Sequence, residues 1–143
     1  MKIFKSKFKF IFYTGKNKFN LSTNNTITLE RYSKEVEKTL NYINDYLEVK
    51  ELDIFDNIVF SDGVLKITLA KNKNFVLNIQ RPNLQLWLSS PISGPQRFEF
   101  DLNSQKWKNN RNSEDLLEIL NKELNDILAE NKIDSSIDLN YKY

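Results

Sequence analysis

Carboxylates and one tryptophan are the side chains of this sequence best suited to chemistry or binding. The 143 residues contain neither cysteine nor histidine. Zinc sites normally use Cys or His ligands, and acyl-transfer triads normally use His as the base. No Gly-rich phosphate loop is present either. We therefore expect no ordinary enzyme, and any metal site must use oxygen ligands, which favours hard cations such as iron, magnesium or calcium.

The carboxylates concentrate in the segment 35–56. Its acidic residues are Glu35, Glu37, Asp45, Glu48, Glu51, Asp53 and Asp56. Carboxylates on a helix face and on the strand that follows can bind a hard cation through their oxygen atoms. Their spacing matches neither an EF-hand loop nor another compact cage. Two interpretations stay open: weak iron binding at more than one position, or a plain solvated charged surface.

The tryptophan belongs to a strand with two unlike faces. Residues 84–89 alternate with period two, which places Leu84, Leu86 and Leu88 on the core face. The same counting places five residues of neighbouring strands on the other, open face: Asn78, Gln80, Gln85, Trp87 and Arg97. Trp and Arg are frequent anchors of protein interfaces. This face is either a partner surface or one that the tail or neighbouring side chains cover.

Two helices and about six strands must position these residues. An apolar stripe predicts a helix over 30–48, and a second stripe predicts one over 113–130 with Ser113 as its N-cap. Alternating segments predict strands at 52–60, 64–70, 75–80, 84–89, 96–101 and 105–108. The connections between these predicted strands are only a few residues long, and such short turns join antiparallel neighbours. The sequence therefore predicts an α+β two-layer sandwich, with both helices on one face of an antiparallel sheet. Ile133, Ile137 and Leu139 of the tail are expected to pack onto the helices.

The N-terminal 25 residues differ in charge from the rest of the chain. Residues 1–29 contain six lysines and no acidic residue. From residue 30 onward, 15 basic residues face 19 acidic ones, a net charge of −4 that argues against a nucleic-acid partner. No apolar run approaches the ~18 residues that span a bilayer. We expect residues 1–25 to be a targeting segment for a mitochondrion-type organelle or a disordered basic arm, followed by one domain, 26–143.

Several motifs give this chain a resemblance to a known family. They are residues 61–65 (SDGVL), Asn78, Gln80, Pro82, Asn83, residues 85–91 (QLWLSSP), residues 93–95 (SGP), Arg97 and Phe98. Over roughly residues 30–140 the chain resembles frataxin, the family that includes the bacterial CyaY proteins. Trp107 then falls where the family has its last strand, and Leu116 and Leu117 fall where it has its second helix.

The resemblance implies a function in iron–sulfur cluster assembly. Frataxins bind the complex of cysteine desulfurase and scaffold protein, stimulate sulfur transfer, and are credited with supplying iron. By position, the family's acidic iron-binding ridge corresponds to Glu35, Glu37, Asp45, Glu48, Asp53 and Asp56. The family's scaffold-contacting surface corresponds to Asn78, Gln80, Asn83, Gln85, Trp87 and Arg97. The resemblance also implies a location in the mitochondrial matrix, and we expect a monomer when the protein is free.

This chain departs from the family pattern at several positions. Ile79 and Leu84 stand where members often have lysine, and Phe100 stands where a tryptophan is expected. The acidic ridge is thinner, with Lys34 and Lys38 in or beside it. Two alternatives to a non-catalytic regulator stay open. One is an iron oxidation or storage protein, and the other is an RNA-binding sheet on which Trp87 stacks with bases.

Overall fold

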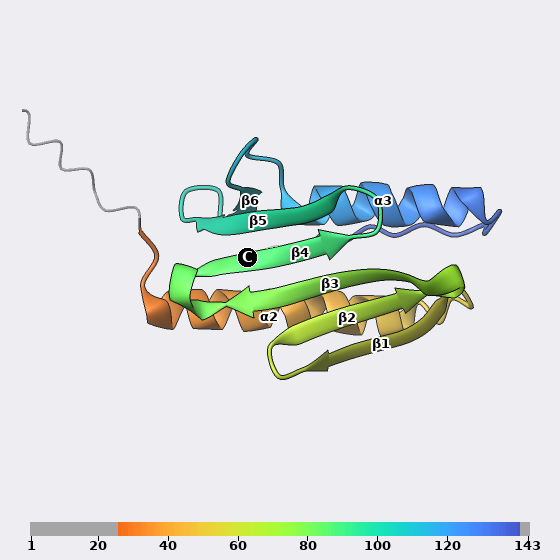
Figure 1. Ribbon diagram of the computed structural model, residues 1–143, viewed down its shortest axis with the longest axis horizontal. Coiled ribbons are helices and arrows are strands. Elements are labelled where there is room, and N and C mark those ends of the chain that lie inside the picture. The colour runs from red at the N-terminus through yellow and green to blue at the C-terminus, as the bar shows by residue number, and fades with distance from the viewer. Residues whose placement is uncertain (1–25, 141–143) are drawn as a thin grey trace, which may run out of the picture.

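The computed structural model describes residues 26–140, in which two helices cover one face of a six-stranded sheet (Figure 1). The helices are α2 (Leu29–Val49) and α3 (Leu116–Glu130). The strands are β1 (Phe55–Ser61), β2 (Val64–Leu69), β3 (Lys73–Gln80), β4 (Gln85–Ser90), β5 (Gly94–Asp101) and β6 (Lys106–Asn109). All neighbouring strands pair antiparallel in the order β1 to β6. This confirms the predicted α+β two-layer sandwich.

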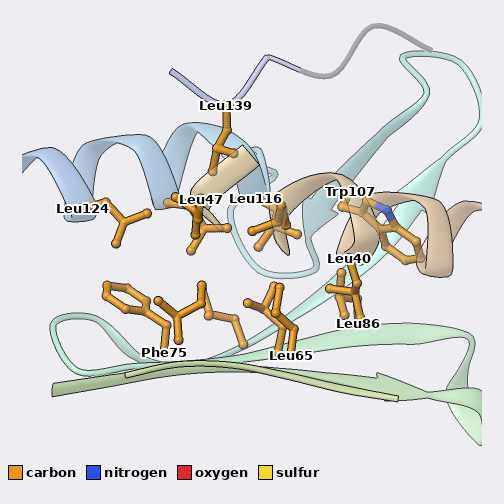
Figure 2. Packing of buried hydrophobic residues seen from close by; sticks show 14 of the residues in the cluster. Leu40, Leu47, Leu65, Phe75, Leu86, Trp107, Leu116, Leu124 and Leu139 are labelled. Carbon is orange, nitrogen blue, oxygen red and sulfur yellow. The ribbon is translucent and has the colours of Figure 1, made fainter. Parts of the chain in front are cut away.

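The core lies between the sheet and the two helices. Figure 2 shows leucines of α2 and α3 pointing toward Leu65, Phe75 and Leu86 of the sheet. The apolar stripe of α2 is buried as the sequence predicts. Trp107 of β6 is also buried, with its ring edge-on to Tyr32 and Phe100 at centroid distances of 5.9 and 5.2 Å. Among residues 26–140, neither helix has the length and apolar character needed to cross a bilayer.

The second helix begins later than the sequence predicts. Its N-cap is Asp115, whose Oδ1 accepts hydrogen bonds from the backbone N–H groups of Leu117 and Glu118 at 2.8 and 3.1 Å. Ser113 has a φ of 62°, a left-handed conformation that cannot begin an α-helix. The prediction of Ser113 as the N-cap was therefore wrong, because the carboxylate two residues later satisfies the free N–H groups of the first turn.

One residue of the predicted core row lies outside its strand. Leu86 and Leu88 are buried, but Leu84 has a left-handed φ of 52° after the short 3₁₀ turn η2 (Arg81–Asn83). Leu84 still packs partly against the core. Leu84 thus ends the Arg81–Asn83 turn, although alternation alone assigns it to β4.

A carboxylate fixes the turn between β5 and β6. Asp101 accepts hydrogen bonds from the Ser104 hydroxyl at 2.5 Å and from the backbone N–H groups of Ser104 and Asn103 at 3.1 and 3.2 Å. The Ser104 hydroxyl, followed by these N–H groups, lowers the pKa of Asp101 below its usual value. Because the folded pKa is lowered, this stabilisation is present above the ordinary carboxyl pKa and is lost as the pH falls through the lowered value.

We expect Asp101→Asn to make the protein less stable at pH 7 and to matter less in acid. The asparagine retains an acceptor oxygen but not the charge that strengthens these hydrogen bonds. Urea unfolding of both proteins at pH 7 and pH 3 measures the effect. The stability difference between them should shrink at pH 3. An equal difference at both pH values would show that the charge of Asp101 contributes nothing.

Candidate functional site

The open face of the sheet carries three rows of side chains across β3, β4 and β5. The strand pairing aligns Asn78 with Trp87 and Trp87 with Arg97, so these three residues form the central row. One flanking row contains Gln80, Gln85 and Glu99, and the other contains Val76, Ser89 and Pro95. Both helices lie on the opposite face (Figure 1). The period-two alternation thus placed Trp87 correctly, on the face without helices.

Trp87 is held in one orientation by its neighbours. Its indole Nε1–H donates a 2.9 Å hydrogen bond to Oε1 of Gln85, and Gln85 Nε2 donates at 2.8 Å to Oε1 of Glu99. The Arg97 guanidinium lies over the ring, with its Cζ 4.7 Å from the centroid. A cation above the ring face is attracted by the ring quadrupole. The ring is therefore preorganised, half-buried among polar groups, and little side-chain entropy is left to lose on binding.

The six residues predicted as a partner surface do not have equal access. Asn78, Gln80 and Trp87 are half-buried, and Arg97 is exposed. Asn83 is exposed in the Arg81–Asn83 turn, which precedes β4, and so does not lie on the face of that strand. Gln85 is only 8% exposed, and its side chain bonds to Trp87 and Glu99. Gln85 therefore orients the tryptophan and offers little surface of its own.

A groove of about 820 Å³ runs beside Trp87 toward α3. Arg97, Ile92, Arg111 and Lys122 are among the residues that line it. β6 pairs only with residues 98–101 of β5, so the first half of β5 has no strand on its outer side among the described residues. The groove occupies that gap and gives the open face a partly apolar border with charges of both signs, since Glu114 and Glu123 also line it. Residue patterns did not predict this groove, because its presence depends on how much of β5 the short strand β6 covers.

The turn between β4 and β5 is tied to α3 by a buried carboxylate. The hydroxyl of Ser90 donates a short hydrogen bond to Glu123 and accepts from the backbone N–H groups of Ile92 and Ser93 at 3.0 and 3.1 Å. Ser90 and Glu123 are both buried. This arrangement holds Ile92, which is 48% exposed, at the border of the groove. Sequence reasoning missed Glu123, since it lies among the charged residues of an amphipathic helix.

The predicted acidic residues are spread over a surface and do not form a cage. Glu37, Asp45, Glu48, Asp53 and Asp56 are exposed. Glu37 is paired with Arg81 at 3.4 Å. Between residues 26 and 140, no group of three or more carboxylates comes close enough to hold a metal ion. The geometry therefore suits weak, dispersed cation contacts better than one tight site.

Glu35 was predicted in this surface, but the structure buries it to 2% exposure. Residues three and four apart share a helix face. Glu35 thus lies on the side of α2 that carries Thr39, whose hydroxyl accepts a 3.0 Å hydrogen bond from the Trp107 indole. Oε1 of Glu35 pairs with Nε of Arg31 at 2.8 Å, while Oε2 of Glu35 is buried without a hydrogen-bond partner. The position of Glu35 does not support a role as a member of the exposed acidic surface.

Comparison with known proteins identifies the family. A family model described as a frataxin-like domain matches residues 25–130. The mitochondrial frataxin homologue of Schizosaccharomyces pombe is 36% identical over 103 residues, which cover 70% of this chain and 65% of that protein. Mitochondrial frataxin of Caenorhabditis elegans is 35% identical over 114 residues, which cover 73% of this chain and 80% of that protein. Both names agree with the mitochondrial localisation that we predicted, although the predicted targeting segment, 1–25, lies outside the described residues.

Solved structures agree with this match. Trimeric frataxin from the yeast Saccharomyces cerevisiae, in a structure complexed with ferrous iron, has a TM-score of 0.60 and 34% identity. The alignment covers 66% of this chain and 86% of the yeast chain. The chain spans 65% of the S. pombe relative and 56% of the one from Arabidopsis thaliana. From the family model, these relatives and the shared fold together, this chain belongs to the frataxin family.

Proposed function

We propose that this chain regulates iron–sulfur cluster assembly without being an enzyme itself. It binds the complex of cysteine desulfurase and scaffold protein through its open sheet face and stimulates sulfur transfer. The observation that carries this proposal is Trp87, which is fixed by Gln85 and Arg97 on the face opposite both helices. A rigid aromatic ring beside an arginine is a typical centre of a protein interface.

Three further features support a protein partner over the alternative of an RNA-binding sheet. The body from residue 30 onward has a net charge of −4, which opposes a phosphate backbone. The Trp87 ring is already covered on one side by Arg97, so a base has less of the ring to stack on. The groove beside it combines charged residues of both signs with the exposed Ile92, a mixture that suits a protein segment.

We expect Trp87→Ala to leave the protein folded and to abolish its stimulation of the desulfurase. Loss of an aromatic anchor typically costs ~2 kcal/mol or more of binding free energy, which corresponds to roughly 30-fold weaker affinity. The measurement is desulfurase activity of the assembly complex at fixed iron, titrated with wild type or variant. Leu29→Ala removes an exposed apolar side chain from α2 and is the matched control. Normal stimulation by folded Trp87→Ala would contradict the proposal.

We further propose that the acidic surface binds iron weakly, as a cargo. Replacing Glu48, Asp53 and Asp56 by their amides should lower the Fe(II) affinity at least tenfold, because it removes three of the exposed charges of the acidic surface. Neutralising Glu114, Asp126 and Glu130 is the matched control, since these exposed carboxylates lie on or beside α3. Titration calorimetry under anaerobic conditions measures the affinity. An equal loss in both triple variants would indicate a general charge effect and no site.

The same variants separate iron delivery from the alternative of iron oxidation. An oxidising protein should make Fe(II) consume oxygen at a different rate from free iron in buffer, and the acidic variant should abolish that difference. If the wild-type protein leaves the rate of free iron unchanged, the oxidation hypothesis is wrong. The regulatory proposal does not depend on that result, because its measurement is desulfurase stimulation.

A further inference from the structure

The segment after α3 returns along the helix layer as an extended chain (Figure 1). We call residues 131–140 the tail. Its burial alternates with period two over all ten residues, and the most buried are Ile137 at 3% and Leu139 at 2% exposure. Figure 2 shows Leu139 pointing from the tail into the core cluster. The frataxin-like domain match ends at residue 130, so the tail lies beyond the part that the family model describes.

Two asparagines of α3 bind the tail backbone as a neighbouring strand would. Asn125 Nδ2 donates to the Ile137 carbonyl at 2.7 Å, and the Ile137 N–H donates to Asn125 Oδ1 at 2.8 Å. Asn121 makes the same reciprocal pair with Leu139, at 2.9 and 2.6 Å. A side-chain amide has both a donor and an acceptor, so one asparagine satisfies both backbone groups of a residue.

Two tyrosines of α2 bind the other edge of the tail. The hydroxyl of Tyr46 accepts from the Asp138 N–H at 2.8 Å, and that of Tyr42 accepts from the Asn140 N–H at 2.9 Å. Four helical residues advance ~6 Å along the axis, and two extended residues advance ~6.6 Å. Binding residues four apart on each helix therefore match tail residues two apart. Asn121, Asn125, Tyr42 and Tyr46 define what we call the tail groove.

We propose that the tail groove is a peptide-binding site for an extended segment with apolar residues two apart, and that it accepts the tail of a second copy of this chain. The hydrogen bonds of these four side chains to residues 137–140 go to backbone groups, so this part of the recognition does not depend on the peptide's side chains. Selectivity comes from the two buried positions that Ile137 and Leu139 occupy. The tail of a second copy satisfies every one of these contacts, because its sequence is the same.

The connection to α3 favours the chain's own tail in the monomer. Linkage gives the tail an effective concentration in the millimolar range. Exchange between copies is therefore expected when the chain's own tail is disabled or when protein concentration approaches the effective concentration.

Two complementary full-length variants test the proposal. The groove-disabled copy carries Asn121→Ala and Asn125→Ala with an intact tail. The tail-disabled copy carries Ile137→Asp and Leu139→Asp with an intact groove. Each alone should be monomeric by light scattering, and an equimolar mixture should form a one-to-one complex. A third copy with all four substitutions is the control and should form no complex with the tail-disabled copy.

A synthetic peptide of residues 131–140 gives a second readout. It should bind the tail-disabled copy and raise its melting temperature. A peptide of the same composition, in which residues 137 and 138 are exchanged, should bind at least 30-fold more weakly because one apolar residue then points outward. If Ile137→Asp with Leu139→Asp prevents folding, Leu139→Ala replaces it. The proposal is wrong if the folded copies form no complex and millimolar peptide does not bind.

Discussion

Replacing Trp107 by alanine should lower the free energy of unfolding by about 3–5 kcal/mol, the usual cost of removing a buried aromatic side chain. Trp107 is 2% exposed and packs edge-on against Tyr32 and Phe100. Its indole N–H donates a 3.0 Å hydrogen bond to the Thr39 hydroxyl, which also donates at 2.8 Å to the Glu35 carbonyl. The substitution thus leaves a cavity and removes one of the links between β6 and α2.

The two tryptophans of the chain provide the comparison that tests this role. Trp87→Ala should cost less than about 1 kcal/mol, because the ring is half-buried on the open face and outside the core cluster. Trp107→Phe keeps most of the ring but loses the donor to Thr39, so its cost should fall between the two. Urea unfolding followed by circular dichroism measures all three variants without depending on tryptophan fluorescence. A smaller loss for Trp107→Ala than for Trp87→Ala would contradict this division of roles.

Periodicity was sufficient to predict the layers because burial is one-sided in this fold. The stripe from Tyr32 to Leu47 and the alternation around Trp87 each have one apolar face, and each face had only one place to be buried. The same argument placed Ile137 and Leu139 against the helices, and both are in the core cluster. The motif around residues 85–91 then identified the family, which burial patterns alone do not do.

The errors concern contacts that depend on tertiary structure. Glu35 looks like an exposed helical carboxylate, but it is buried on the side of α2 where Thr39 bonds to Trp107 of β6. Gln85 shares a face with Trp87, yet it is buried because the tryptophan and Glu99 both bond to its side chain. Asn121 and Asn125 are ordinary polar residues in the sequence of α3. Their role becomes visible only in the folded chain, where the tail lies beside them. No local sequence pattern indicates that their amides bind the backbone of tail residues 12 and 18 positions away.

The tail should behave as one cooperative unit, which predicts non-additive substitutions. We expect Leu139→Asp to lower the free energy of unfolding by about 3 kcal/mol, within the range for loss of a buried leucine. A buried aspartate without a partner is costly, so the tail should detach and leave the rest folded. The loss is then limited to the free energy with which the tail docks. Adding Ile137→Asp to Leu139→Asp should therefore cost almost nothing more.

One core residue of the sheet and one of α3 supply the control for this prediction. Leu65→Ala and Leu124→Ala lie in β2 and α3, which cannot detach separately, so their costs should approach the sum of the single losses. Urea unfolding of the single and double variants measures both pairs. If Ile137→Asp and Leu139→Asp add fully, the tail is an integral part of the core, and a groove that exchanges it has no physical basis. If the second substitution adds no further loss of stability, the loss in the double variant equals the docking free energy of the tail. That free energy sets how strongly the tail of a second copy must compete for the groove.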